Sequence, residues 1–255
     1  MPTSLGAHSP HAALARELLT KKGRREHGRF SFEGPTLLEE ALASGVSIER
    51  IFVTADAAAR HGVVGRAESE ATPVHLVDQK TLGRMSDVET PAGIVAVAPM
   101  VLETPEELLD EPGLVALLAG VSDPGNAGTL LRSAEAFGLT RVLFASGSVE
   151  PYHPKVVRAA MGSIFRLRLG VITAAELAAR PEWQVTGLDA RGTPLDALSW
   201  PEKAVIAVGS ERQGLGPFEP LCGRTAAIPM RGKAESLNAS VAGSLAFYEA
   251  AKRLK

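Results

Sequence analysis

The chain has 255 residues, of which 45% are hydrophobic and 22% charged, which are ordinary values for a folded globular protein of one large or two small domains. Its formal net charge of −2 excludes a globally basic surface, so any binding of nucleic acid needs a local patch. The single cysteine, Cys222, excludes an internal disulfide and a multi-cysteine metal site.

The start of the chain carries no export signal. Residues 1–10 lack a basic segment followed by an apolar run, which is the pattern of a signal peptide. No uninterrupted apolar stretch is long enough to cross a bilayer. One cysteine also makes a reducing compartment the default. We therefore expect a cytoplasmic protein with no membrane partner.

A basic run follows between residues 16 and 29. It sets six cations against two glutamates, and the cations are Arg16, Lys21, Lys22, Arg24, Arg25 and Arg29. A run this short is either a solvated face of the N-terminal domain or a patch that binds RNA phosphates. On the second interpretation, these six residues are the RNA-binding candidates.

The first hundred residues alternate helix-like and strand-like segments. Leucines at helical spacing predict a helix over 35–42, which Gly45 ends. Short apolar runs predict strands over 48–53, 73–77 and 93–97. The segment between Pro99 and Gly113 is rich in prolines and acidic residues, which favours a linker with one short helix.

The β/α alternation is stronger after Gly113. Residues 114–121 form a continuous apolar run, typical of a strand buried on both faces of a parallel sheet. A turn and a helix over 127–137 follow, and Gly138 ends the helix. Further strands are predicted over 141–145, 204–208 and 225–229. The last helix is expected to begin near Ser236, with one apolar stripe made of Leu237, Val241, Leu245 and Tyr248.

Three polar, glycine-containing loops follow strands in this second half. They span residues 122–128, 209–216 and 229–238. Ligands of open parallel sheets bind beyond the carboxyl ends of the strands, and glycines let the backbone approach a ligand closely. We therefore expect the three loops to share one pocket.

The loops exclude several common ligands. None carries the Gly-Lys-Ser/Thr of a P-loop or the GxGxxG of a dinucleotide site. The histidines form no HExxH pair, so no metal is expected. Ser210 lies in Gly-Ser-Glu-Arg-Gln, which differs from the Gly-x-Ser-x-Gly of a hydrolase.

The loops resemble the three ordered motifs of the SpoU (TrmH-like) family, a branch of the SPOUT RNA methyltransferases. The matching segments are Asn126-Ala-Gly-Thr-Leu-Leu-Arg132, Gly209-Ser-Glu-Arg-Gln-Gly-Leu215, and Ile228-Pro-Met230 with Ser236-Leu-Asn-Ala-Ser240. Arg212 departs from the pattern, because many relatives have a small residue after the glutamate. More loosely, residues 16–98 resemble an L30e-like substrate-binding domain through Arg29-Phe30, Phe32-Glu-Gly34 and Pro91-Ala-Gly-Ile94.

The resemblance implies an α/β fold with two domains. Residues 1–100 would form a smaller L30e-like domain that binds the RNA substrate, and residues 101–112 a linker. Residues 113–255 would form the SPOUT methyltransferase domain, a parallel sheet tied in a trefoil knot. The resemblance also implies a homodimer with active sites near the subunit interface, S-adenosyl-L-methionine as cofactor, and no metal. Its substrate would be RNA, with ribosomal RNA favoured over transfer RNA.

The resemblance also assigns roles to residues. Gly209, Ile228, Met230 and Leu237 would bind the cofactor, and the catalytic set would be Arg132, Asn126, Glu211, Ser236 and Asn238. A guanidinium holds its proton too firmly to be a good base, so we favour Arg132 as a group that holds phosphate or stabilises the alkoxide, and leave base action open.

Each assignment has a purely structural alternative. Arg132 would cover a helix flank, Asn126 would be a turn or helix N-cap residue, and Glu211 a carboxylate at a helix start. Ser236 and Asn238 would cap the last helix, and Ile228 and Leu237 would be core residues.

The predicted function is the methylation of a ribose 2′-hydroxyl in RNA. Two other classes of protein stay open. One is a non-catalytic RNA-binding protein with a degenerate knot domain, and the other is an α/β enzyme that acts on a small molecule without RNA. Asn126, Arg132, Glu211 and Asn238 together count against the first, and binding of a nucleotide without RNA dependence would favour the second.

Overall fold

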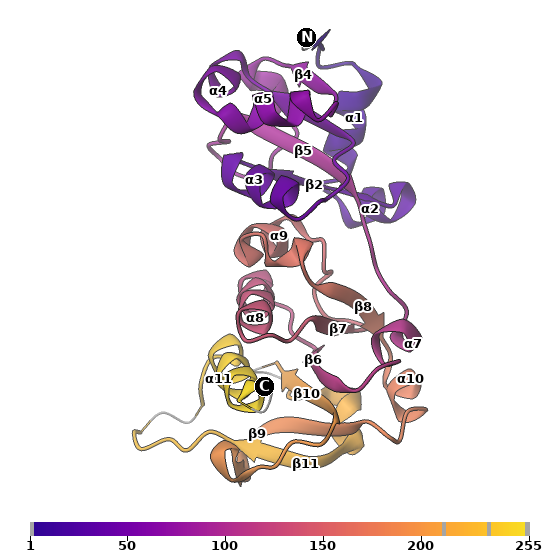
Figure 1. Cartoon of the computed structure of the whole chain (residues 1–255), viewed down its shortest axis with the longest axis vertical. Helices are drawn as coiled ribbons and strands as arrows, with labels where there is room; N and C mark the ends of the chain where they lie inside the picture. Colours follow the sequence, from indigo (N-terminus) through magenta and orange to yellow (C-terminus); the bar gives the residue numbers. More distant parts are fainter. Residues whose placement is uncertain (1–2, 211–212, 234–235, 253–255) are drawn as a thin grey trace. The chain divides into compact units, whose positions relative to one another are not determined.

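The computed structural model describes residues 3–210, 213–233 and 236–252, and it divides into two compact units (Figure 1). One unit comprises Met1–Met100 and Tyr152–Phe165, and the other Val101–Pro151 and Arg166–Lys255. The chain first passes from one unit to the other after Met100, and Tyr152–Phe165 groups with the N-terminal unit. Within the described ranges, no helix has the length and apolarity needed to span a membrane.

The N-terminal unit is built on a five-stranded sheet in the order β1-β4-β3-β5-β2. The strands are β1 (Thr3–Ser4), β2 (Arg29–Glu33), β3 (Arg50–Val53), β4 (Val74–Leu76) and β5 (Ile94–Pro99). β5 runs antiparallel to the other four strands. The strands predicted over 48–53, 73–77 and 93–97 are confirmed, whereas β2 was not predicted.

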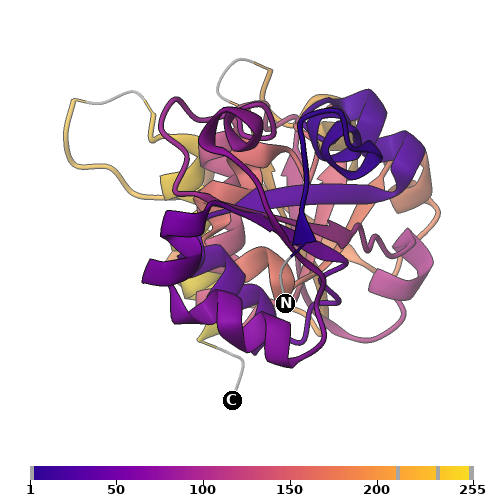
Figure 2. The ribbon, with the colours of Figure 1, turned by 90° about the horizontal axis from the view of Figure 1, so that it is seen from above.

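Helices lie on both sides of this sheet (Figure 2). They are α1 (Pro10–Glu17), α2 (Lys21–His27), α3 (Pro35–Ala43), α4 (Ala55–Arg60), α5 (Gly62–Ser69) and α6 (Gln79–Gly83). The predicted helix over 35–42 is α3. Because α1 buries Ala12, Ala15 and Leu18 against Phe52 and Val95, its apolar side fixes it to one face.

The segment Tyr152–Phe165 contains α9 (Pro154–Ala160) and the short helix η1 (Ser163–Phe165). Aromatic packing attaches it to β2, since the ring centroids of Tyr152 and Phe30 lie 4.5 Å apart. Arg158 donates a hydrogen bond to Glu33 at 3.2 Å and also pairs with Asp87. Contacts with residues that are distant in the chain therefore assign this segment to the N-terminal unit.

The C-terminal unit has a six-stranded parallel sheet in the order β11-β9-β10-β6-β7-β8. Its strands are β6 (Gly113–Ala119), β7 (Arg141–Ala145), β8 (Arg168–Ile172), β9 (Gln184–Pro194), β10 (Lys203–Gly209) and β11 (Cys222–Ala227). β6, β7 and β10 match predicted strands, β11 begins and ends earlier than predicted, and β8 and β9 were missed. The strand order does not test the predicted trefoil knot, which stays a prediction.

Two layers of helices cover this sheet. On one face α8 (Pro124–Ala136) and α11 (Ala239–Ala251) lie side by side (Figure 1). The apolar cluster on the other face includes residues of α7 (Pro105–Leu108), α10 (Ala174–Ala178) and η3 (Gly216–Leu221), and a further short helix, η2 (Leu195–Ala197), follows β9. α7 is the short helix expected in the linker, and Thr104 and Glu107 close its first turn as a capping box.

The last helix differs from its prediction. It begins at Ala239 with Asn238 as its N-cap, three residues after the predicted start near Ser236. Its buried face consists mostly of small residues. The helix packs closely there, since a Cβ on Gly243 would lie 2.3 Å from the side chain of Leu130. The stripe of Val241, Leu245 and Tyr248 faces outward instead, with exposed fractions of 48%, 42% and 51%.

Candidate functional site

A cavity of about 320 Å³ lies at the carboxyl ends of β10 and β11, beside the middle of β9. All four predicted cofactor residues line it, namely Gly209, Ile228, Met230 and Leu237. The predicted catalytic residue Ser236 lines it as well. The structure thus brings the second and third predicted loops together around one space, whose volume is typical of a small-molecule site.

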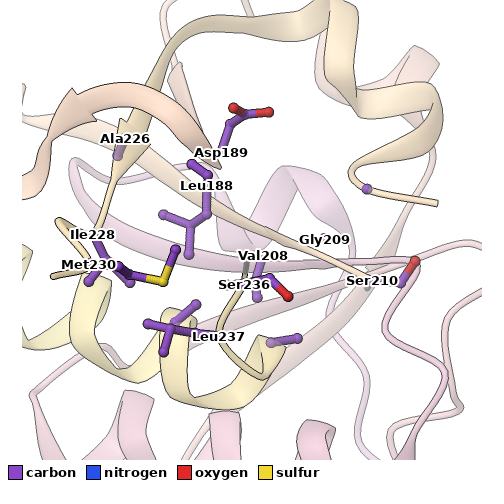
Figure 3. A pocket seen from close by; sticks show the side chains of 14 residues that line it. Leu188, Asp189, Val208, Gly209, Ser210, Ala226, Ile228, Met230, Ser236 and Leu237 are labelled. Carbon is purple, nitrogen blue, oxygen red and sulfur yellow. The ribbon is translucent and has the colours of Figure 1, made fainter. Parts of the chain in front are cut away.

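The cavity is apolar at one end. The side chains of Leu188, Ile228, Met230 and Leu237 converge there from β9 and from the segment between β11 and α11, while Ser210 lies at the far end (Figure 3). An apolar end of this kind suits the faces of a flat ring, and backbone groups of the same loops are available to its edges.

Asp189 of β9 is the only charged residue among the described residues that line the cavity. Hydrogen bonds from Arg191 hold the pKa of the Asp189 carboxyl below its ordinary value, so it is ionised at neutral pH. Nε and Nη2 of Arg191 lie 3.2 and 3.4 Å from its two carboxylate oxygens, so Arg191 already balances the charge of Asp189. Sequence reasoning missed Leu188 and Asp189, although Gly-Leu-Asp at the end of an apolar run is the same signal that marked the other strand ends.

One wall of the cavity is a tight loop. The N–H of Ser210 donates to the carbonyl of Gly214 at 2.9 Å, and the N–H of Gly214 donates to the carbonyl of Ser210 at 3.0 Å. A Cβ on Gly209 would lie 2.5 Å from the carbonyl carbon of Gly214. Glycine is therefore needed at 209 because the returning backbone crosses directly over it.

The first and third motifs meet at a pair of asparagines. The Nδ2 atom of Asn238 donates to Oδ1 of Asn126 at 3.0 Å. The Oδ1 atom of Asn238 accepts the N–H groups of Ser240 and Val241, so this side chain both caps α11 and reaches α8. Asn126 is not an N-cap, because Asp123 caps α8 and accepts the N–H of Asn126 at 2.7 Å.

Arg132 lies on the exposed side of α8 and, within the described ranges, lines neither this cavity nor the larger one beside it. The next residue, Ser133, shares a hydrogen bond of 2.6 Å with Ser244 of α11. Arg132 therefore lies beside the outward stripe of α11. The predicted catalytic residue Glu211 and its neighbour Arg212 lie outside the described residues.

The basic run divides into exposed and structural side chains. Arg24 is 1% exposed and donates to the carbonyl of Leu18 at 2.8 Å, so its assignment to RNA is corrected to a structural role. Nε of Arg29 lies 2.7 Å from a carboxylate oxygen of Glu49, which neutralises its charge. Arg16 is half-buried, which leaves three exposed cations on α2, namely Lys21, Lys22 and Arg25.

Neither a metal nor a reactive thiol is indicated in the part of the chain that the structure describes. No group of three His, Cys, Asp or Glu side chains there is placed to hold an ion. Burial raises the pKa of the Cys222 thiol to about 11, so it stays protonated at neutral pH.

The chain is similar to known RNA methyltransferases. Residues 113–248 match the model of the SpoU rRNA Methylase family, and residues 13–96 match that of the MRM3-like substrate binding domain. The chain is 31% identical to the 23S rRNA (guanosine(2553)-2′-O)-methyltransferase RlmP of Bacillus subtilis, over 91% of this chain and 92% of the relative. It is 30% identical to an uncharacterized tRNA/rRNA methyltransferase of Mycobacterium avium, over 99% and 86%.

A solved structure shows the same fold over the whole chain. The AdoMet-bound rRNA methyltransferase from Sinorhizobium meliloti superimposes with a TM-score of 0.84 at 25% identity, covering 99% of this chain and 98% of the other. The two predicted modules, a substrate-binding domain and a methylase domain, thus occur together in known proteins.

Proposed function

Because the chain belongs to the SpoU rRNA methylase family, we propose that it transfers a methyl group from S-adenosylmethionine to a ribose 2′-hydroxyl of structured ribosomal RNA. The observation that carries this proposal is the cavity that gathers Gly209, Ile228, Met230, Ser236 and Leu237 from two separate motifs.

The residues of the cavity fit this cofactor. When bound, S-adenosylmethionine supplies an electrophilic methyl group on a positively charged sulfonium. Ile228 and Leu237 would cover the faces of its adenine, and the backbone beside Gly209 would bind the polar edge. Displacement of a methyl group from a sulfonium needs positioning more than covalent help, so these contacts supply much of the rate.

The catalytic assignments remain part of the proposal. The Asn126–Asn238 hydrogen bond would hold the first turn of α8 against the start of α11, and so orient the ribose. Ser236 would bind the substrate or cofactor from the rim of the cavity. Glu211 would position RNA or the catalytic arginine. Arg132 would stabilise the developing alkoxide or hold the neighbouring phosphate.

We favour ribosomal over transfer RNA, and a cytoplasmic location follows from that choice. The substrate-binding domain at residues 13–96 and the 23S rRNA named for RlmP support it. Mapping ribose methylation in cells with and without the gene tests this directly. One ribosomal nucleotide should lose its 2′-O-methyl group, and loss at a transfer RNA nucleotide alone would redirect the proposal to transfer RNA.

Calorimetry should show binding of S-adenosylmethionine that ATP and NAD do not displace.

We also propose that the protein is a homodimer built on the outward stripe of α11, which is Val241, Leu245 and Tyr248. Large apolar side chains at helical spacing on one exposed face favour burial against a second copy. Arg132 lies beside this stripe and outside its own cavity, so pairing would bring it toward the site of the other subunit. A dimer would therefore complete the active site.

Replacing Leu245 with glutamate is expected to give a monomer that keeps its cofactor affinity and loses most of its methyl transfer. A buried charge without a partner opposes the contact. Sedimentation and calorimetry measure the two effects. Val171→Glu is the matched control, because Val171 is 39% exposed and lies outside the stripe, on β8. A Leu245→Glu monomer with full activity would contradict the proposal.

The three exposed cations of α2 are proposed to bind RNA phosphates. Removing two charges with Lys21→Ala and Arg25→Ala should weaken binding of unmethylated ribosomal RNA and lower the slope of log affinity against log salt by up to about 2. Arg60→Ala with Arg66→Ala removes the same charge from α4 and α5 and should change little. If both double substitutions weaken RNA binding equally, α2 has no special role in binding RNA.

A further inference from the structure

A second cavity of about 860 Å³ lies beside the cofactor cavity. Described residues from three segments line it, each at the carboxyl end of a strand: residues 119, 120 and 122–124 after β6, residues 145–147 after β7, and residues 210 and 213–218 after β10. Its size is within the range of small-molecule sites, and none of the roles assigned above uses it.

The two cavities share one wall. Ser210 and Gly214 line both, and these are the residues joined by the paired backbone hydrogen bonds of the tight loop. The second cavity also reaches Asp123 and Pro124 at the start of α8. A nucleotide whose ribose lies at the shared wall would therefore place its base in the second cavity.

The lining of this cavity suits a base better than a phosphate. No lysine, arginine or histidine occurs among the described residues that line it. Its buried side includes Ala145, Leu215 and Phe218, which offer contact to a flat ring. Its polar groups are the hydroxyls of Ser122 and Ser146, the amide of Gln213 and the carboxylate of Asp123.

We propose that the second cavity binds the base of the nucleotide that is methylated, and that it selects guanine. The inference rests on the proposed function, because enzymes that modify a nucleotide commonly draw it out of its stack into a pocket. A carboxylate only accepts hydrogen bonds, and guanine places an N–H and an amino group side by side on its Watson–Crick edge. Asp123 accepts one N–H, from Asn126, and a carboxylate has about four acceptor positions, so acceptor capacity remains for the base.

The first test fills the cavity. Ser146 follows β7 and lines the cavity, so Ser146→Trp should weaken binding of GMP to the full-length protein by about tenfold or more. Ligand-observed NMR on protein saturated with S-adenosylhomocysteine measures this, with ribose 5-phosphate to report any contribution of sugar and phosphate. The matched control is Thr140→Trp, an exposed position at the opposite end of β7 that should bind GMP normally.

The second test concerns selectivity. Wild-type protein should bind GMP more tightly than AMP, CMP or UMP. Asp123→Asn keeps a side-chain oxygen for the cap of α8 but loses the charge, so it should lower GMP affinity about tenfold and remove the preference.

Normal GMP binding by Ser146→Trp, equal binding of all four nucleotides, or ribose 5-phosphate binding as well as GMP would each overturn the inference. Calorimetry with S-adenosylhomocysteine and rRNA methylation by the wild-type protein test the proposed function separately. If both succeed and Ser146→Trp methylates rRNA at the normal rate, only the base site is refuted.

Discussion

Arg132→Ala is expected to lower the single-turnover rate of methyl transfer by roughly 10²–10³-fold, which is the usual effect of losing one well-placed electrostatic group. Cofactor affinity should stay unchanged, because Arg132 lies outside the described lining of the cavity. Stability should change little as well, since the side chain is exposed. Rapid-quench measurement with labelled cofactor reports the rate, and calorimetry reports the affinity.

The charge-conserving variant separates charge from geometry. Arg132→Lys keeps the positive charge but loses the planar pair of donors, so it should recover little activity if the guanidinium must bind two oxygens at once. A folded Arg132→Ala protein with a nearly normal single-turnover rate would remove Arg132 from the catalytic set. It would also weaken the roles carried over to Asn126 and Glu211, which rest on the same motif.

Gly209→Ala is expected to weaken S-adenosylmethionine binding by up to about 100-fold, since overpacking of this kind costs about 1–3 kcal/mol. The new Cβ would lie 2.5 Å from the backbone of Gly214, so the backbone of Gly214 must move. Gly214 lines the cavity, and its displacement changes the shape that the cofactor meets.

Gly223→Ala is the matched control for this variant. Gly223 lies in β11 of the same sheet, where an added Cβ meets no atom within 4 Å. It should bind cofactor normally and unfold at an unchanged temperature. If Gly209→Ala also binds normally while folded, the loop is more adaptable than its hydrogen bonds indicate, and the assigned wall of the cofactor site is wrong.

The local chemistry of the site was predictable from the chain alone. Gly209, Ile228, Met230 and Leu237 were selected from motif positions, and all four line one cavity. Such motifs can be recognised in the sequence because each loop must supply glycine or a particular side chain, whatever residues occur elsewhere in the chain. The buried strand β6 (Gly113–Ala119) was predictable for a similar reason, since a strand covered on both faces of a parallel sheet is continuously apolar.

The tertiary structure decided which side of each element is covered. The small residues of α11 face the sheet because α8 and β10 approach closely at Gly243, and this turns Val241, Leu245 and Tyr248 outward. Arg24 has the same charge as its exposed neighbours, yet it is buried where a carbonyl is available to it. A one-dimensional pattern gives the period of a helix but not the partner that selects its buried face.

Contacts between residues distant in the chain account for the features that the sequence did not predict. Asp189 became part of the site because β9 lies between β10 and β11, and α9 joined the N-terminal unit because Tyr152 and Arg158 find partners on β2 and near Asp87. Arg158 and Asp87 lie 71 positions apart in the chain, and Asn126 and Asn238 lie 112 positions apart. The sequence by itself determined which side chains were candidates for the site, whereas strand order and packing decided which of them meet, because a contact depends on both partners and a local pattern describes only one.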